Sequence, residues 1–172
     1  MPVGGNHKKC HIDTFVPSYM ASEFGISTLL DIGCSTGDMV RVFQSLGIDA
    51  EGIDGDKELV YRNNIKYHDL TFSPYPGKWD AIWSVEVLEH LEKGFALNNF
   101  FETIKYSKIV FCTASQDNSP SVHVTIEPLY WWENEFKKYG FILDCERTSL
   151  IRKNSDMERD FIRNTGMIYI RS

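Results

Sequence analysis

The sequence lacks three features that would each indicate a particular class of protein. None of its apolar runs approaches the roughly 18 residues that a membrane-spanning helix needs. The N-terminal stretch MPVGGNHKKCHID has no apolar core behind its lysines, so we expect no secretory signal. A formal net charge of -6 leaves no excess of Lys and Arg for phosphate contacts. We therefore expect a cytoplasmic protein with neither a membrane nor a nucleic-acid partner.

Cysteine is also scarce, and its spacing does not indicate a metal site. The four cysteines are scattered without the paired spacing of a zinc site: Cys10, Cys34, Cys112 and Cys145. We expect buried, reduced thiols, with the last two in strands. His7 and His11 are four residues apart, a helical spacing, but no acid or third ligand accompanies them. The sequence therefore predicts no metal.

Strand-like and helix-like segments alternate along most of the 172 residues, a length typical of a single domain. Residues 27–33 form an apolar run that ends in glycine, as in a strand covered on both faces. Residues 38–48 follow with apolar residues at helical spacing. The same alternation predicts further strands at 49–54, 65–70, 79–87 and 108–115, and helices at 57–64, 98–107 and 127–140.

The last part of the chain breaks this alternation. Residues 141–153 and 166–172 both have the pattern of extended segments, and a charged loop joins them, so we expect an antiparallel hairpin. The predicted fold is α/β: a doubly wound, mostly parallel seven-stranded sheet with a C-terminal antiparallel hairpin and helices on both faces. Ligands in such folds bind at the carboxyl ends of the strands, where the strand order reverses.

The loop after the first predicted strand, DIGCSTG, is rich in small residues. Gly33 and Gly37 allow a ligand to approach the backbone closely, and the next helix offers unsatisfied N–H groups. A dinucleotide site would show G-x-G-x-x-G spacing, but Ser35 occupies the second glycine position. Asp31, just before the loop, would repel a pyrophosphate and attract an ammonium group. The loop therefore suits a ligand with a cationic amino-acid end, and a nicotinamide-dependent oxidoreductase is disfavoured.

Acidic residues end the next two predicted strands. Asp54 closes the strand DAEGID, where a carboxylate can accept two hydrogen bonds from a ribose diol. Asp69 in YHDL stands where its side chain could receive an adenine amino group. Each has a purely structural alternative, a strand-end cap for Asp54 and a turn-initiating residue for Asp69.

These segments, taken in order, resemble the motifs of a known enzyme family. LLDIGCSTG, GIDGD, YHDL and WDAIWSVEVLEHL are similar to the successive motifs of class I S-adenosylmethionine-dependent methyltransferases of the small-molecule type. The family's first motif usually carries three alternating glycines, and Ser35 replaces the middle one. The resemblance covers roughly residues 29–141. It implies a single Rossmann-like methyltransferase domain over residues 1–172, with residues 1–26 as an N-terminal helical or cap segment.

The resemblance also implies S-adenosylmethionine as the cofactor and assigns contacts to it by motif. The small-residue loop would hold the methionine moiety, the second strand end the ribose, and the third the adenine. The fourth strand would line the pocket beyond them. The residues so implied are Asp31, Gly33, Cys34, Ser35 and Gly37; Asp54 and Gly55; Asp69 and Leu70; and Ser84 and Glu86.

Methyl transfer from a sulfonium is an in-line displacement, so the protein mainly aligns the reactants and removes water. A base is needed only if the acceptor is protonated, as a hydroxyl is. His90 in VLEHL and His123 in SPSVHVTIEP are the candidate catalytic bases. A solvated loop histidine is the structural alternative for both.

The acceptor is expected to be a small molecule. The (Asn/Asp)-Pro-Pro-aromatic motif of enzymes that methylate nucleic-acid amino groups does not follow the fourth strand, and no cysteine follows a proline as in cytosine-carbon methylation. We expect methyl transfer to an oxygen or nitrogen; the alternative is a cofactor-binding subunit or regulator with little turnover. The acceptor site would be open, closed by an N-terminal segment that includes His11, Phe15 and Tyr19, or completed by another subunit, as in a homodimer.

Overall fold

The computed structural model describes residues 10–59, 65–117 and 123–172. His7 and most of the helix expected at 57–64 lie outside these ranges. The strands are β1 (Thr28–Ile32), β2 (Asp49–Asp54), β3 (Ile65–Tyr67), β4 (Ala81–Ser84), β5 (Ile109–Cys112), β6 (Phe141–Leu143) and β7 (Met167–Arg171). The α-helices are α1 (Phe15–Phe24), α2 (Asp38–Ser45), α3 (Phe95–Ile104), α4 (Leu129–Lys138), α5 (Cys145–Asn154) and α6 (Phe161–Thr165), with 3-10 turns η1 (Lys57–Leu59) and η2 (Leu88–His90).

The strands form one seven-stranded sheet in the order β3-β2-β1-β4-β5-β7-β6. The pairs from β3 to β5 are parallel, and β7 runs antiparallel to both β5 and β6. The predicted mostly parallel, doubly wound sheet is therefore confirmed. The chain leaves β1 toward β2 on one side and returns to β4 on the other, so a crevice opens at the carboxyl ends of β1 and β4.

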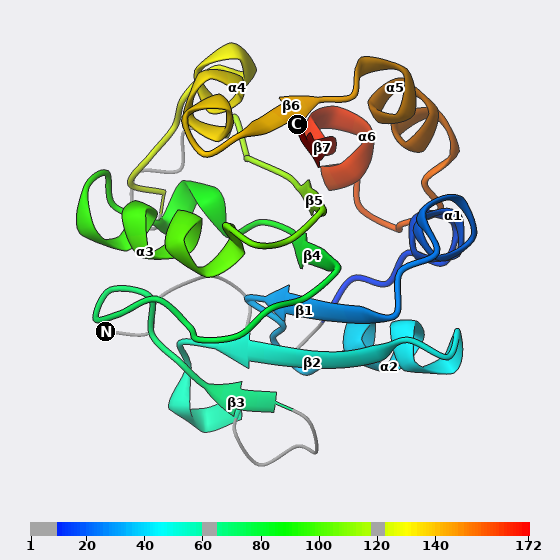
Figure 1. Cartoon of the computed structure of the whole chain (residues 1–172), viewed down its shortest axis with the longest axis horizontal. Helices are drawn as coiled ribbons and strands as arrows, with labels where there is room; N and C mark the ends of the chain where they lie inside the picture. Colours follow the sequence, from blue (N-terminus) through cyan, green and yellow to red (C-terminus); the bar gives the residue numbers. More distant parts are fainter. Residues whose placement is uncertain (1–9, 60–64, 118–122) are drawn as a thin grey trace.

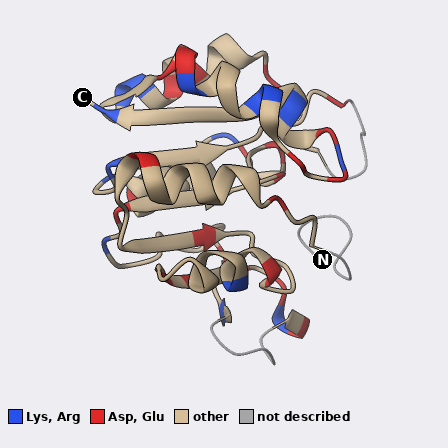
Figure 2. Cartoon of the chain, turned by 90° about the vertical axis from the view of Figure 1, so that its right-hand side faces the viewer, with Lys and Arg blue, Asp and Glu red and all other residues tan. Residues whose placement is uncertain are grey.

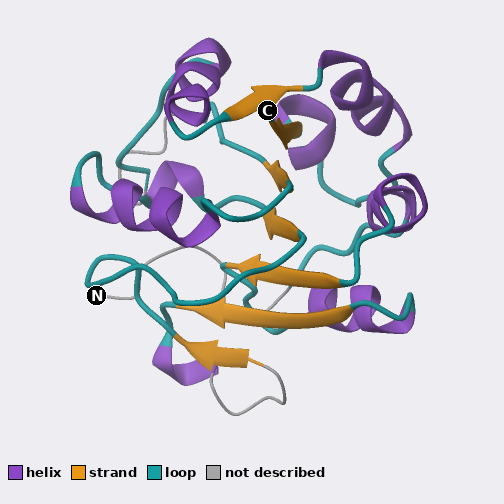
Figure 3. Cartoon of the chain, in the orientation of Figure 1, coloured by secondary structure: helices purple, strands orange, loops and turns teal. Residues whose placement is uncertain are grey.

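Helices cover both faces of the sheet because neighbouring strand residues point to opposite sides (Figures 1 and 3). Leu30 of β1 belongs to a buried cluster with Phe100 of α3 and Trp132 of α4. Leu29, next to it in β1, belongs to a second cluster with Phe43 of α2, and α1, α5 and α6 also contribute to this cluster. The two clusters hold the strands rigidly, and the loops at the crevice project from this core.

The C-terminal strands are antiparallel neighbours, as predicted, but the expected extended segment at 141–153 is wrong beyond Leu143. The helices α5 and α6 connect β6 to β7, so the pair is not a hairpin. α5 begins where it does because the Asp144 carboxylate accepts a hydrogen bond from the Arg147 N–H at 2.9 Å, an N-cap arrangement. Cys145 is consequently an exposed helix residue and not a buried strand residue.

The fourth strand ends earlier than predicted, at Ser84 instead of Val87. Glu86 has a backbone φ of +57°, which breaks the extended conformation, and η2 follows. The residues after β4 therefore turn across the carboxyl ends of the sheet.

The remaining cysteines fit the expectation of free thiols: Cys34 and Cys112 are buried and Cys10 is half-buried. Charged residues of both signs lie on the outer helices and loops, as Figure 2 shows for the face that carries α1, α2, α5 and α6. None of the helices in the described ranges combines the length and the apolar character needed to cross a bilayer.

Candidate functional site

The loop between β1 and α2 has a backbone that depends on small residues. Gly33, Ser35 and Gly37 all have left-handed φ values, of +76°, +49° and +73°. A Cβ at Gly33 would overlap the Cγ2 atom of Val87, so the segment after β4 can pass directly over the loop. A Cβ at Gly37 would lie 2.8 Å from the Ile65 side chain, so this glycine allows close packing against β3.

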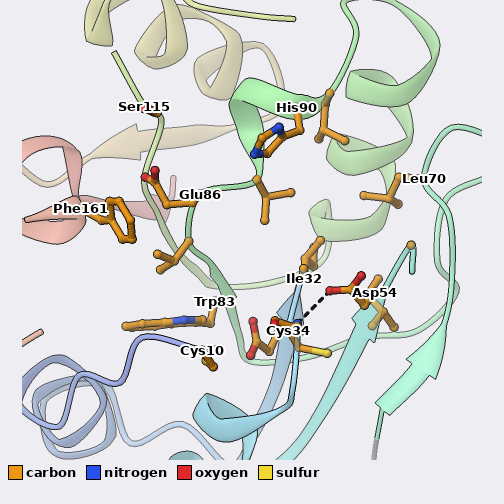
Figure 4. A pocket seen from close by; sticks show the side chains of 18 of the residues that line it. Cys10, Ile32, Cys34, Asp54, Leu70, Trp83, Glu86, His90, Ser115 and Phe161 are labelled. Carbon is orange, nitrogen blue, oxygen red and sulfur yellow. Dashed lines mark hydrogen bonds between the residues drawn. The ribbon is translucent and has the colours of Figure 1, made fainter. Parts of the chain in front are cut away.

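Asp54 fixes the same loop from the neighbouring strand. One carboxylate oxygen accepts a hydrogen bond from the Ser35 N–H at 2.8 Å, and the other accepts one from the Asp56 N–H at 2.9 Å. The Gly33 and Cys34 N–H groups bond to the carbonyl of Ile53, at 2.8 and 3.1 Å. The ends of β1 and β2 are thus joined into one rigid edge, which Figure 4 shows at the base of a cavity.

The cavity has a volume of about 790 Å³ and lies at the carboxyl ends of the strands. This is within the range of pockets that hold small molecules and cofactors. Its wall combines the loop after β1, the ends of β2 and β3, the turn after β4, the loop after β5 and one side of α6. Eleven of the predicted site residues line it: Asp31, Gly33, Cys34, Ser35, Asp54, Gly55, Asp69, Leu70, Glu86, His90 and His123.

Two predicted site residues are not part of the wall. Gly37 is the N-cap of α2, and its contact is with β3. Ser84 is fully buried below the turn after β4, where its carbonyl accepts a hydrogen bond from the Thr113 N–H at 3.1 Å. Both positions shape the residues that do line the cavity.

Asp31 is a buried acid at the floor of the cavity. Its side chain is 3 % exposed, and no hydrogen bond joins its carboxylate to a donor in the part of the chain that the structure describes. Burial raises the pKa of Asp31 well above the usual range, and the negative charge of Asp54 raises it further. A cationic group bound here would donate a hydrogen bond to the Asp31 carboxylate and would neutralise its negative charge.

At the end of β3 the structure shows a turn that also faces the cavity. Asp69 accepts hydrogen bonds from the N–H and the hydroxyl of Thr71, at 2.8 and 2.7 Å, which is the turn-initiating arrangement. Both Asp69 and the largely buried Leu70 nevertheless line the cavity. The carbonyl of Leu70 is held by the Asn99 side-chain amide at 2.8 Å.

The opposite end of the cavity carries titratable side chains. Glu86 donates its N–H to the Thr113 hydroxyl oxygen at 2.8 Å, and that hydroxyl donates to the Glu86 carboxylate at 2.9 Å. Burial and the nearby Glu89 raise the pKa of Glu86 to about 7. Burial also raises the pKa of Glu89. The rings of His90 and His123 pack edge to face with centroids 5.0 Å apart, so the two predicted bases form one cluster.

Several wall residues were not predicted from the sequence. Phe161, Asn164 and Thr165 come from α6, which lies in a segment read as a charged loop, and no local signal marks them. Trp83 was read only as a strand residue. Of the N-terminal residues expected to cover the cofactor, His11 lines the cavity, whereas Phe15 and Tyr19 do not: their rings stack on each other along α1, with centroids 6.2 Å apart.

Comparisons with known proteins agree with this geometry. The model of a methyltransferase-domain family matches residues 10–150. A comparison with curated protein sequences gave no significant match. Among solved structures, magnesium protoporphyrin IX methyltransferase (ChlM) of Synechocystis PCC 6803, with bound S-adenosylhomocysteine, is 15% identical with a TM-score of 0.64, covering 92% of this chain and 81% of its own.

Two further structures share the fold. The methyltransferase domain of bacterial CtHen1-C is 15% identical, with a TM-score of 0.60 over 91% of this chain and 93% of its own. The O-methyltransferase of a trans-AT PKS multienzyme from Brevibacillus brevis is 18% identical, with a TM-score of 0.58 over 77% of this chain and 52% of its own. The family match covers most of the chain, and the strand order and glycine loop agree with it. The chain belongs to the methyltransferase-domain family and is a class I S-adenosylmethionine-dependent methyltransferase.

Proposed function

We propose that this enzyme transfers a methyl group to an oxygen or nitrogen of a small molecule that enters the cavity beside Glu86, His90 and His123. The observation that carries the proposal is the carboxylate of Asp31, which is buried at the floor of a cavity of about 790 Å³ and has no hydrogen-bond donor among the residues that the structure describes. A buried, unpartnered carboxylate is costly, so a cationic ligand is the expected partner.

The residues present fit the cofactor at three points. Asp31 would hold the amino group of its methionine moiety, and the loop at Gly33 lets that moiety approach the backbone. Asp54 would accept the ribose hydroxyls, and the apolar side chain of Leu70 would pack against the adenine, with Asp69 at its edge. The cofactor supplies an electrophilic methyl carbon on a sulfonium.

The protein's own part is then alignment, exclusion of water and acceptance of a proton. Trp83 and Phe161 provide apolar wall on the side of the cavity opposite Leu70, which keeps water from the reacting atoms (Figure 4). At the acceptor end, Glu86, His90 and His123 are the groups that can take a proton from a hydroxyl or an ammonium acceptor. A small acceptor is supported by the volume of the cavity, about 790 Å³.

We propose in addition that the N-terminal segment, residues 1–26 of a single domain over residues 1–172, closes the cofactor end of the cavity. Cys10 and His11 lie in its wall, which supports this role.

The test has two steps, binding and transfer. Isothermal titration should show that the protein binds S-adenosylhomocysteine at one site per chain. Incubation with labelled S-adenosylmethionine and fractions of small metabolites should then give a labelled small product. Binding without transfer to any fraction would favour the alternative, a cofactor-binding subunit or regulator. Label recovered only in protein or nucleic acid would contradict the small-molecule acceptor.

A further inference from the structure

We propose that Glu89, His90 and His123 bind a divalent first-row transition metal ion at the acceptor end of the cavity, where it holds the hydroxyl oxygen of the acceptor. Each of the three residues offers one ligand atom, and these atoms all lie within 4.8 Å of one another. The inference rests on the proposed methyl transfer and narrows its acceptor to an oxygen. From the sequence alone we predicted no metal.

Glu89 provides the first argument. Its side chain is fully buried, and within residues 10–59, 65–117 and 123–172 neither of its carboxylate oxygens has a hydrogen-bond partner. Nearly all buried carboxylates in proteins are paired with donors, cations or metals, because an unpartnered one loses its hydration without compensation. A positive ion bound between Glu89 and the neighbouring imidazoles would supply that compensation.

His123 provides the second argument for a metal site. Its Nδ1 atom lies 2.7 Å from the carbonyl oxygen of Asp117. A carbonyl can only accept, so Nδ1 carries the proton and Nε2 carries the free lone pair of the neutral ring. A backbone carbonyl on one ring nitrogen is the usual way in which proteins orient a metal-binding histidine.

The backbone holds the three groups together before any ligand arrives. The carbonyl of Glu89 accepts hydrogen bonds from the N–H groups of Val124 and Thr125, at 2.8 and 3.0 Å. The Thr125 hydroxyl donates to the carbonyl of Leu91 at 2.7 Å. These bonds fix the loop that carries His123 against η2, which carries Glu89 and His90. Hydrogen bonds of the backbone therefore hold the three side chains of the cluster close together.

The ligand set indicates the class of ion. Two imidazoles with one carboxylate suit Mn²⁺, Fe²⁺, Co²⁺ or Zn²⁺ better than Mg²⁺, which prefers oxygen ligands. Bonds of about 2.1 Å place ligand atoms at most about 4.2 Å apart across an ion, so the side chains need only a small closure. Three protein ligands leave coordination positions open, and His90 and His123 line the cavity, so those positions face the acceptor.

The bound ion would act on a hydroxyl acceptor as a Lewis acid. Coordination lowers the pKa of the hydroxyl, its proton leaves to water or to Glu86, and the metal-held oxygen attacks the methyl carbon. The new O–CH₃ bond forms as the C–S bond breaks, and its electron pair stays on the sulfur of the neutral thioether product. Positive charge passes from the sulfonium to the released proton, so atoms and charge balance.

The test uses untagged protein, stripped with a chelator and titrated with Mn²⁺ and, separately, with Zn²⁺. We expect one saturable site per chain for at least one of these ions. Glu89→Gln and His123→Ala should each weaken metal binding by at least the roughly 10-fold that loss of an outer-shell partner costs, because each removes a direct ligand. His68→Ala is the matched control, because His68 lines the far end of the same cavity and its Nε2 bonds to the Ser73 carbonyl at 2.8 Å. Its affinity for the ion should match that of the wild type.

Thermal unfolding shows whether each variant is folded. If Glu89→Gln is not folded, the metal affinity of His123→Ala alone tests the inference. No saturable binding of either ion, or equal binding by the wild type and a folded variant of the cluster, would overturn the inference. S-adenosylhomocysteine should bind to the metal-free protein, because its contacts lie at the other end of the cavity. Loss of that binding contradicts the proposed function, whereas loss of metal binding alone contradicts only the metal site.

Discussion

Replacing Asp31 by asparagine should weaken cofactor binding and stabilise the empty protein at neutral pH. Asparagine keeps the shape of the side chain but removes the charge that would meet the cofactor's ammonium group. A hydrogen bond to a charged group contributes about 1.5–3 kcal/mol, which corresponds to a loss of about 10- to 150-fold in affinity. Isothermal titration with S-adenosylhomocysteine measures this directly, since the product carries the same amino-acid end.

The stability effect has the opposite sign because the pKa of Asp31 is raised in the folded protein, by burial and by Asp54. Below the unfolded pKa of about 3.9, the carboxyl is neutral in both states and costs nothing. As the pH rises through the folded pKa, the unfolded state releases its proton more readily, so the free energy of unfolding falls. Asp31→Asn avoids this cost. Its urea midpoint should exceed that of the wild type at pH 7, and the difference should shrink as the pH falls toward 4.

Asp49→Asn is the control, because Asp49 is exposed at the amino end of β2, away from the cavity. Asp49→Asn also removes one negative charge, and it should change neither the affinity for S-adenosylhomocysteine nor the urea midpoint. An Asp31→Asn protein that binds S-adenosylhomocysteine as tightly as the wild type would refute the reasoning. So would a difference in urea midpoint between the Asp31→Asn and wild-type proteins that stays constant from pH 4 to pH 7.

Three further predictions concern the loop, the sheet and the N-terminal segment. Gly33→Ala should lower the free energy of unfolding by roughly 1–3 kcal/mol and weaken S-adenosylhomocysteine binding, because the added Cβ meets Val87. Gly25 is the control: its φ is also left-handed, but a Cβ there meets open space, so Gly25→Ala should cost only about 1 kcal/mol. Equal shifts in the thermal midpoints of the two variants would contradict this. A bonded lysine and two backbone N–H groups lower the pKa of Asp80 to about 2, so Asp80→Asn should reduce the free energy of unfolding by about 1 kcal/mol at pH 7. That deficit should shrink as the pH falls from about 4 toward 2, and a deficit independent of pH in urea titrations would count against it. Deleting residues 1–11 should weaken S-adenosylhomocysteine binding in the same titration, and unchanged affinity would argue against a covering role.

The fold and the site residues of the first half of the chain could be predicted because they depend on short sequence patterns. The residues of DIGCSTG combine a buried strand, a turn that needs left-handed backbone and an acid, all within seven positions, and the structure keeps them together. Asp54 and Asp69 were placed at strand ends by the same local pattern. The alternation of strands and helices then predicted the parallel part of the sheet.

The parts that were missed depend on contacts between distant residues. The polar stretch at 145–154 has little amphipathic pattern, and its helix is established by the Asp144 cap and by packing against α1 and α6. Nothing near Phe161 shows that α6 will reach the cavity. His90 and His123 were judged separately, because the backbone bonds from Val124 and Thr125 to Glu89 that bring them together leave no trace in the sequence.

A crystal structure of the protein with S-adenosylhomocysteine tests the orientation of the cofactor most directly. The ligand's amino nitrogen should lie about 2.7–3.0 Å from a carboxylate oxygen of Asp31, with its ribose hydroxyls on Asp54 and its sulfur facing Glu86 and His90. A ligand bound with its adenine over Asp31, or bound outside the crevice between β1 and β4, would contradict it.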